Sequence, residues 1–425
     1  MKVFKFGGAS VKDAESVRNV YSILKKHRQT PLLVVVSAMG KTTNLLEQLL
    51  SAFMQKDVNL QKKHLETLKA YHNNIIEDLF HEFDADLSSY RQLFIDLEDY
   101  LTSESTGNYD FSYAQIVSKG EILSSTILSL YLNVIGCRNQ FLDAKEVIKT
   151  DSNYREGKVN WVLTEKLIQT KIRAFLKNGE SLIITQGFIG ASEKGFPTTL
   201  GREGSDYSAA IFAYCLKAQD VTIWKDVPGL LNADPKCFPD AIKLDEISYR
   251  EAIELTYYGA TVIHPKTLKP LQNRQIPLFV KSFLNDENSG TKIHKIKEFK
   301  PTPSYIFKRN QILISISPKD FSFIAEESLS HIFALFARFR LKINFMQNSA
   351  LSFTVCADNE PDALNHLFKT LEDEFNLKYN TDLELITIRH YTEELVEKIT
   401  QDKTIFAEQK NRTTVQLVVG LRRFL

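Results

Sequence analysis

The sequence predicts an α/β protein with a mainly parallel, helix-covered sheet, followed by a smaller α+β region. The first observation is a series of short, β-rich apolar runs at residues 3–6, 32–36, 182–185 and 221–224, separated by helical segments. The second is a change of pattern beyond residue 300, where strands and amphipathic helices alternate over shorter distances. The third is the length of 425 residues, which exceeds one typical domain.

The first element is the strand at 3–6, which leads through Gly7 and Gly8 into an amphipathic helix with apolar side chains at helical spacing over 17–24. Glycine lets a backbone approach an anion closely, and a helix N-terminus offers unpaired N–H groups and a partial positive charge. Lys5 adds a full positive charge. This layout predicts a polyphosphate site. The alternative is that the glycines form only a tight turn and that Lys5 is a solvated strand residue.

The stretch from about 43 to 135 is rich in Lys, Glu, Leu and Asp and carries no strand signal. It is predicted to be a helical insertion over one end of the sheet, and a lid is its expected role.

A second glycine-rich region follows the strand at 182–185. Residues 186–190 leave that strand, and a polar loop leads to residues 198–206, which open a helix at Tyr207. Arg202 can hold a carboxylate through two parallel N–H bonds, which lysine cannot do, so this region predicts an anionic substrate. The alternatives are that Asp206 is an ordinary helix cap and that Arg202 is a surface arginine.

A third segment, 224–236, is a strand end followed by a Pro-Gly turn and a long loop. Open α/β sheets place ligands at the C-terminal ends of their strands. Turn chemistry explains the Pro-Gly pair. It does not explain why Lys225, Asp226, Asp234 and Lys236 gather around it.

Composition excludes several classes of function. A net charge of +1 provides no basic field for nucleic acid, so we expect no nucleic-acid partner. The four cysteines form no C-x-x-C and indicate neither a zinc site nor a disulfide framework. The nine histidines show no metal-ligand spacing, so no protein metal site is expected. Without a long apolar stretch or a signal peptide, we expect a cytoplasmic protein without membrane contact.

Familiar phosphate-binding signatures are absent. Gly40-Lys41-Thr42 resembles the end of a P-loop, but the first glycine of that motif would fall at Val35, inside a predicted strand. No G-x-G-x-x-G follows a predicted strand, and neither H-R-D nor D-F-G occurs. Neither dinucleotide chemistry nor a protein-kinase site is therefore supported.

A polar turn at 285–290 and the stiff connector 301–303 mark a domain boundary. Beyond it we predict strands at 312–316, 343–346, 351–356, 383–388 and 415–419, and helices at 328–339, 362–375 and 393–399. This order is that of a β-α-β-β-α-β module followed by a shorter second copy. Such modules commonly pair edge to edge and bind small molecules at the seam, although packing alone would also explain them.

Taken together, the segments resemble the aspartate kinases of the amino-acid-kinase family. Eight motifs occur in the family's order over residues 1–295: 5–10, 37–40 with 43–46, 120–121, 186–190, 201–207, 226–229, 234–235 and 258–265. The resemblance implies an amino-acid-kinase catalytic domain at 1–298, with the helical insert at about 43–135. It also implies a tandem ACT regulatory domain at 304–425, with a short second module.

The resemblance implies transfer of the γ-phosphoryl group of ATP to the side-chain carboxylate of L-aspartate, the first step of lysine, threonine and methionine biosynthesis, with Mg²⁺ bridging the phosphates. A carboxylate is already ionised at neutral pH, so the reaction needs no general base. The protein then has to position the reactants and neutralise charge on the transferring group.

The resemblance also implies residue roles. The catalytic residues would be Lys5, Gly7 and Gly8, which hold the phosphates, and Asp206, which orients the cationic groups. In the substrate pocket, Arg202 would bind the α-carboxylate and Glu121 the ammonium, and the pocket would be completed by Ser37, Thr43, Phe188 and Ser205. The nucleotide would contact Lys5, Gly8, Lys225, Asp226, Leu231, Lys236 and Thr261. Candidate effector residues are Ser322, Asn344, Asn348 and Ser349.

Several positions depart from the family pattern. Relatives usually have threonine where this chain has Lys225, and often have tyrosine at Leu231, arginine at Lys236 and lysine at Thr261. Our hypothesis is that Lys225 replaces the cation missing at 261. Lysine-inhibited relatives usually carry an acidic residue in the place of Asn344. Feedback by lysine or threonine is therefore a hypothesis, and we expect a homodimer formed through the ACT modules.

Two alternative functions stay open. One is a small-molecule kinase of the same superfamily that acts on a different acid. The other is a non-catalytic amino-acid sensor, which the changes at Leu231 and Thr261 would suit.

Overall fold

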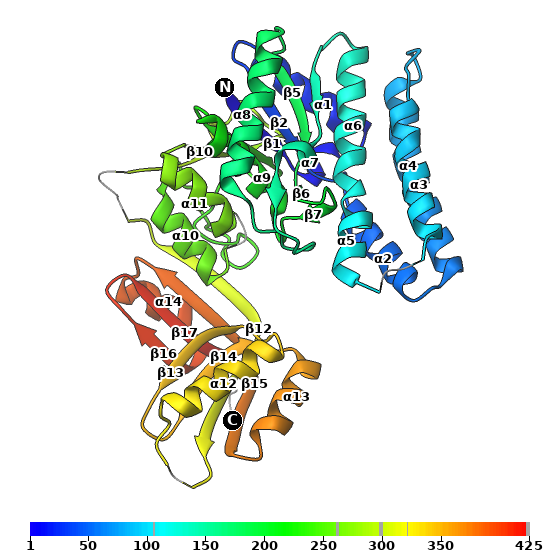
Figure 1. Ribbon diagram of the computed structural model, residues 1–425. Helices are drawn as coiled ribbons and strands as arrows, with labels where there is room; N and C mark the ends of the chain where they lie inside the picture. The colour runs from blue at the N-terminus through cyan, green and yellow to red at the C-terminus, as the bar shows by residue number, and fades with distance from the viewer. Residues whose placement is uncertain (105–106, 261–262, 297–300, 321, 422–425) are drawn as a thin grey trace. The chain divides into compact units, whose positions relative to one another are not determined.

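The computed structural model describes residues 1–104, 107–260, 263–296, 301–320 and 322–421 (Figure 1). The chain forms two compact units. The first comprises Met1–Leu230, Lys243–Ile253 and Val262–Lys297. The second comprises Leu231–Ile242, Glu254–Thr261 and Glu298–Leu425. The second unit therefore includes two segments that precede residue 298 in the sequence.

The first unit is built on an eight-stranded sheet with the order β3-β5-β2-β1-β8-β10-β11-β9. The strands are β1 (Lys2–Phe6), β2 (Leu32–Val36), β3 (Gln140–Leu142), β5 (Leu182–Gln186), β8 (Val221–Lys225), β9 (Glu246–Ser248), β10 (Leu278–Ser282) and β11 (Thr291–His294). All described pairings are parallel except that of β10 with β11. The prediction of a mainly parallel sheet is confirmed, and β1 lies at its centre between β2 and β8.

Apolar side chains explain why β1 is central. Phe4, Phe6 and Trp224 are buried, and the rings of Phe6 and Trp224 stack at 5.9 Å with planes 4° apart. These aromatic rings hold β1 against β8. The predicted first helix is α1 (Ala14–Lys26), which Asp13 caps by accepting a hydrogen bond from the backbone N–H of Ser16 at 2.8 Å.

Further helices of the first unit are α7 (Ala144–Val147), α8 (Trp161–Lys177), α9 (Gly204–Leu216), α11 (Pro265–Arg274) and the start of α10 (Tyr249–Tyr258). A small second sheet joins β4 (Lys149–Thr150), β6 (Ile189–Ser192) and β7 (Pro197–Thr199). The helix that was expected to open at Tyr207 begins at Gly204. That start was wrong because the left-handed residue Glu203 (φ 52°) turns the chain into the helix three residues earlier.

The stretch predicted to be helical contains α2 (Thr42–Met54), α3 (Val58–Phe80), α4 (Ser88–Thr102), α5 (Tyr109–Val117) and α6 (Lys119–Val134). Their apolar faces join those of α1 and the sheet in one continuous core. The stretch is therefore packed into the first unit and is not a separate domain.

The second unit contains one six-stranded antiparallel sheet with the order β13-β14-β12-β15-β17-β16. Its elements are β12 (Ser304–Pro318), α12 (Glu326–Arg338), β13 (Ile343–Asn348), β14 (Phe353–Asp358), α13 (Pro361–Leu371), β15 (Phe375–Arg389), α14 (Glu393–Thr400), β16 (Lys403–Lys410) and β17 (Thr414–Leu421). The two long strands β12 and β15 pair with each other and run through both modules, so the modules share one sheet.

Several details of this unit differ from the sequence-based expectation: β14, expected at 351–356, spans Phe353–Asp358, and β15, expected at 383–388, already begins at Phe375. β12 begins at Ser304, directly after the proline connector, and not at residue 312. α13 ends at Leu371, and Phe375 already belongs to β15, whereas a helix to residue 375 was expected. β16 was not expected at all, because its exposed polar side chains hide the strand pattern.

Candidate active site

Lys5 and Asp206 form a buried ion pair at the centre of the sheet. β1 carries Lys5 at its C-terminal end, and the first turn of α9 carries Asp206. The Lys5 Nζ lies 2.6 Å from Asp206 Oδ1, and the side chains are 9% and 4% exposed. Lys225, at the end of neighbouring β8, brings its Nζ to 3.7 Å from the other oxygen, Oδ2. One buried carboxylate thus holds two cations at the end of two adjacent strands.

Two opposing effects act on the pKa of Asp206. Burial opposes ionisation of the carboxyl group, but the charges of Lys5 and Lys225 hold its pKa below the usual range for aspartate. Asp206 is therefore ionised at neutral pH. The cluster of three groups carries one net positive charge, which suits a site that receives an anion.

Gly7 and Gly8 follow Lys5 but have different surroundings. A Cβ atom on Gly8 would lie 2.8 Å from the Ala38 carbonyl oxygen and 2.9 Å from that of Gly40. A Cβ on Gly7 would meet the Lys5 Nζ at 3.5 Å, an ordinary contact. Glycine at position 8 is thus required by the close approach of the chain after β2, whereas position 7 borders the Lys5 ammonium.

Glu121, on the first turn of α6, is 4% exposed. It accepts a hydrogen bond from the backbone of Ala38, but its Oε2 atom is buried and has no hydrogen-bond partner. Burial raises the pKa of Glu121 to about 8, although the positive charge of Lys5 favours ionisation. A buried carboxylate oxygen without a donor calls for a cationic ligand group.

Arg202 lies in the turn that precedes α9 and is exposed. In the described part of the chain its guanidinium has no ion-pair or hydrogen-bond partner, and it lies close enough to His264 to help lower the pKa of that imidazole, after the larger effect of burial. A free guanidinium beside Ser205 and Asp206 is available to a carboxylate ligand.

Phe188 is held in an unusual backbone conformation. Its φ is 66°, in the left-handed region, and its backbone N–H donates to Ser208 Oγ at 2.9 Å. Added Cβ atoms would lie 2.6 Å from the Phe188 ring at Gly204 and 2.5 Å from the Ser205 side chain at Gly187. The glycines therefore allow the loop of Phe188 to pack tightly against the start of α9.

Ser37 begins the segment that joins β2 to α2, and Thr43 lies just beyond it at the start of α2. The backbone N–H of Ser37 donates to the Phe6 carbonyl at 3.1 Å, and its carbonyl accepts from Ser124 Oγ at 2.7 Å. Thr43 is half-buried on the first turn of α2. Both hydrogen bonds of Ser37 anchor the segment to β1 and to the helix that carries Glu121.

The residues expected to contact the nucleotide are divided between the two units. Lys5, Gly8, Lys225 and Asp226 belong to the first unit, and Asp226 is exposed directly after β8. Leu231 and Lys236 belong to the second unit, where Lys236 is exposed and its backbone N–H donates to Asp234 Oδ1 at 2.9 Å. Thr261 lies outside the described residues.

Asn344, a candidate effector residue, has its side chain engaged within the second unit. Its Nδ2 donates to Gln311 Oε1 and Asp358 Oδ1, both at 2.9 Å, and its Oδ1 accepts from Lys308 Nζ at 2.7 Å. Burial lowers the pKa of Lys308. An internal ammonium group therefore already lies against Asn344.

The other effector candidates lie near one turn. Asn348 ends β13, Ser349 follows it, and both are exposed. The backbone N–H of Ile324 donates to the Ala350 carbonyl at 3.0 Å, which brings the exposed Ser322 segment beside this turn.

Sequence reasoning assigned no role to three supporting residues: Ala38, whose backbone N–H contacts Glu121, and Gly187 and Ser208, which position Phe188. Gly187 carried a signal, because a glycine directly after a buried strand indicates a close approach. Ser208 carried none, since a serine inside a predicted helix reads as an ordinary helical residue.

In the described part of the chain no helix combines the length and the apolar character that a membrane crossing requires. Nor do the described residues bring three or more His, Cys, Asp or Glu side chains together in a way that could hold a metal ion.

Comparisons with known proteins identify the family and the fold of the chain. Residues 1–282 match the model of the amino acid kinase family. Lysine-sensitive aspartokinase 3 of Escherichia coli is 31% identical over 365 residues, which cover 84% of this chain and 78% of that protein. The chloroplastic bifunctional aspartokinase/homoserine dehydrogenase 1 of Zea mays is 32% identical over 303 residues, and the match covers 68% of this chain and 32% of that enzyme. The chain thus spans about a third of the length of such bifunctional relatives.

Solved structures extend the similarity to both units. E. coli aspartokinase III in complex with aspartate and ADP superposes with a TM-score of 0.82 at 26% identity, and its complex with lysine and aspartate superposes with a TM-score of 0.83 at 25% identity. Each comparison covers 99% of this chain and 96% of the other. The predicted fold class, an amino-acid-kinase fold followed by ACT-like modules, is confirmed by these matches.

Proposed function

The chain belongs to the amino acid kinase family and, within it, to the aspartokinases, and from this premise we propose that it transfers the γ-phosphoryl group of ATP to the side-chain carboxylate of L-aspartate. The products are ADP and 4-phospho-L-aspartate. The observation that carries the proposal is the buried cluster of Lys5, Asp206 and Lys225. Preorganised cations of this kind stabilise the charge on a transferring phosphoryl group.

The reaction balances without a proton-transfer residue. A new bond forms between the γ-phosphorus and an oxygen of the aspartate side chain, and the bond to the β–γ bridging oxygen breaks, so that ADP leaves with the electron pair. The attacking carboxylate is ionised at neutral pH. Lys5 stabilises the charge on the transferring oxygens, with Gly7 and Gly8 bordering the phosphates. Asp206 acts as a positioning residue, because it fixes both cations.

Aspartate would bind through its two charged backbone groups. The partnerless Oε2 of Glu121 suits the α-ammonium, and the free guanidinium of Arg202 suits the α-carboxylate. The pocket would be completed by Ser37, Thr43, Phe188 and Ser205. The aspartate-bound structures of E. coli aspartokinase III support this choice of substrate.

ATP would lie against Lys5, Gly8, Lys225 and Asp226 of the first unit. The ADP complex of E. coli aspartokinase III supports a nucleotide substrate. Mg²⁺ usually keeps several waters and binds through one or two carboxylates plus substrate phosphates. The exposed carboxylate of Asp226 fits that pattern. The ion would neutralise phosphate charge, and Asp226 would hold it.

Regulation by an amino acid is a further part of the proposal. The lysine complex of E. coli aspartokinase III supports a lysine effector, with threonine as the alternative. Ser322, Asn348 and Ser349 would contact it near the turn after β13. Asn344 would take part only if Lys308 released its side-chain oxygen. Measuring activity at increasing lysine and at increasing threonine concentration tests this regulation. Activity that changes with neither amino acid contradicts it.

We also propose a homodimer formed through the second unit, with residues 1–298 as catalytic domain and 304–425 as regulatory domain. In the described sheet β13 and β16 are the outer strands, which can pair with another copy. The four cysteines are free thiols, as suits the reducing cytoplasm, where we expect this enzyme to begin lysine, threonine and methionine synthesis.

A coupled assay of ADP release tests the proposal. We expect ATP-dependent and aspartate-dependent release, with little release for L-glutamate or for no acid. Stronger release with another acid would favour a different kinase of the superfamily. No release with any acid, with intact binding of aspartate, would favour the non-catalytic sensor.

A further inference from the structure

A cavity of about 310 Å³ lies among α8, α9 and α11 in the first unit. Its lining includes three aromatic rings, Trp161, Tyr207 and Tyr214, and two lysines, Lys266 and Lys269. No carboxylate lines it. The cavity borders the proposed active site, because Tyr207 follows Asp206 on α9 and the charges of Lys266 and Arg202 both act on His264, but none of its lining residues is assigned to aspartate or ATP.

The aromatic rings form a fixed wall. The Trp161 ring lies 4.9 Å from that of Tyr214 and 6.4 Å from that of Tyr207, both nearly edge to face. The guanidinium of Arg274 lies 4.4 Å from the centre of the Tyr214 ring and is itself held by Glu165 at 3.1 Å. A rigid aromatic wall binds planar rings with little loss of side-chain freedom.

The polar groups that line this cavity are available to a ligand. Within the described residues the ammonium groups of Lys266 and Lys269 form no ion pair, and the Tyr207 and Tyr214 hydroxyls and the Trp161 indole N–H have no hydrogen-bond partner. Burial raises the pKa of Tyr207, so its hydroxyl remains a donor at neutral pH. The cavity therefore offers cations and hydrogen-bond donors together with aromatic surface.

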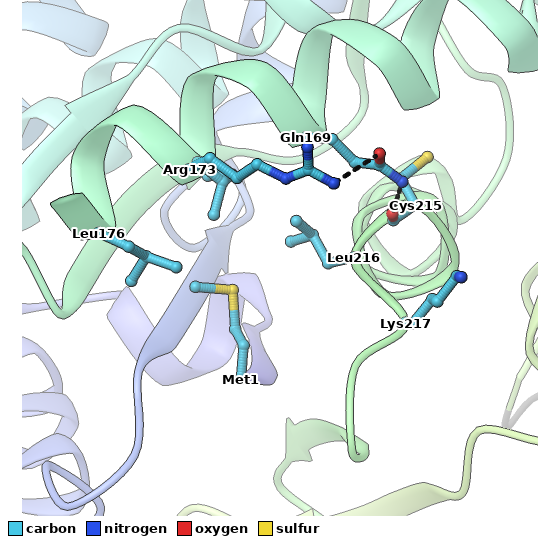
Figure 2. Close-up of a pocket in the computed structure, with 8 residues that line it drawn as sticks. Met1, Gln169, Arg173, Leu176, Cys215, Leu216 and Lys217 are labelled. Carbon is cyan, nitrogen blue, oxygen red and sulfur yellow. Dashed lines mark hydrogen bonds between the residues drawn. The ribbon is translucent and has the colours of Figure 1, made fainter.

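A second cavity of the same unit is different. It has a volume of about 280 Å³ and lies between α8 and the end of α9 (Figure 2). There the Gln169 side chain donates to the Cys215 carbonyl at 2.9 Å and accepts from Arg173 at 3.5 Å. Two of its polar side chains, Gln169 and Arg173, are paired with each other, and its lining includes no aromatic ring.

We propose that the cavity among α8, α9 and α11 binds a planar aromatic anion of the nucleoside monophosphate class. The base would lie against Trp161, Tyr207 and Tyr214, and the phosphate against Lys266 and Lys269. The volume is at the small end of the range for ligand pockets, which suits a mononucleotide. This site is additional to the proposed ATP site and does not depend on the aspartate kinase activity.

Tryptophan fluorescence provides the first test. The chain has two tryptophans, and Trp224 is 1% exposed and stacked on Phe6, so a ligand-dependent change reports Trp161. The full-length protein is titrated with AMP and UMP while Mg·ADP and aspartate saturate the active site. We expect saturable quenching by at least one of them. Adenosine and ribose 5-phosphate, which each lack half of the ligand, should bind about tenfold more weakly.

Calorimetry on variants provides the second test. Replacing both lysines, Lys266→Gln and Lys269→Gln, should weaken binding about tenfold, and Trp161→Leu should do the same. The matched control is Lys62→Gln, at an exposed position of α3, which should bind like wild type. Binding of neither AMP nor UMP to the wild-type protein overturns the proposal, as does equal affinity in the double-lysine variant. A Trp161 signal that follows protein concentration without ligand also overturns it, because a second copy would then fill the cavity.

Discussion

The ammonium nitrogen of Lys5 lies 2.6 Å from Oδ1 of Asp206, and both side chains are almost fully buried. β1 and the first turn of α9 bring them together, and Lys225 joins from β8 at 3.7 Å. A buried carboxylate that loses its cation strongly destabilises the folded protein. The ion pair of Asp206 with Lys5 should therefore stabilise the fold around the site. We therefore expect function and local stability to depend on the same three groups.

Replacing Lys5 should separate catalysis from aspartate binding. In Lys5→Met we expect kcat to fall about 10²- to 10³-fold, because a preorganised cation no longer stabilises the transferring group. The KM for aspartate should change little. The same substitution at exposed Lys62 is the control. Steady-state kinetics with wild-type kcat in Lys5→Met would show that the ion pair is structural only.

Lys225 tests the hypothesis of a replacement cation. Both Lys225→Ala and Lys225→Met should raise the KM for ATP several-fold, since each removes a charge that Asp206 holds near Lys5. The methionine variant keeps most of the side-chain volume, so an equal effect in both assigns the loss to charge. Wild-type ATP kinetics in both variants would reject the hypothesis.

Glu121 should make aspartate binding depend on pH. Its pKa is raised to about 8 by burial, and only the ionised form attracts an ammonium group. The KM for aspartate should therefore fall as the pH rises from about 6.5 to about 8.5. In Glu121→Gln we expect a higher KM without this dependence. A KM in wild type that does not change over this range contradicts the assigned role.

Glu121 should also make the free energy of unfolding fall as the pH rises. The folded pKa of Glu121 is raised, so its contribution is fully present below the unfolded pKa of about 4.3 and is lost as the pH rises toward 8. Urea denaturation measures this free energy of unfolding. Over this pH interval it should decrease less in Glu121→Gln than in the wild-type protein. Parallel curves for the two proteins would contradict the raised pKa.

Alanine substitutions at the two glycines after β1 should have different effects. Gly8→Ala should reduce the free energy of unfolding by about 2 kcal/mol, because its Cβ would lie 2.8 Å from the Ala38 carbonyl oxygen. Gly7→Ala should leave stability nearly unchanged, since its Cβ makes only ordinary contacts, yet it should raise the KM for ATP. Denaturation midpoints and kinetics check both. Equal stability of the two variants would mean that the chain after β2 moves aside.

Much of the first unit could be predicted from the sequence because its strands are buried on both faces. β1, β2, β5 and β8 read as continuous apolar runs, and their ends lie within one residue of the predicted limits. The cluster around Lys5 could be proposed because glycine and charge mark the ends of these strands. The distance from Lys225 to Asp206 could not, since it depends on the register between β1 and β8 and on the start of α9.

The second unit was harder to predict. β12 and β15 pass through both modules, so apolar residues such as Tyr305 and Ile314 serve two different cores along one strand. A periodicity of two marks one face but not where a strand begins or ends. The hydrogen bond of Lys308 to Asn344 joins β12 to β13, which are separated by β14 in the sheet, and no local pattern indicates such a contact.

The central claim is that the acceptor is the side-chain carboxylate of aspartate. Incubation with ATP, Mg²⁺ and L-aspartate in the presence of hydroxylamine, followed by mass spectrometry, tests it most directly, because hydroxylamine converts an acyl phosphate into a stable hydroxamate. We predict ATP-dependent aspartate β-hydroxamate in the wild-type protein and almost none in Lys5→Met. ADP release without β-hydroxamate, or equal hydroxamate formation by both proteins, would contradict the account.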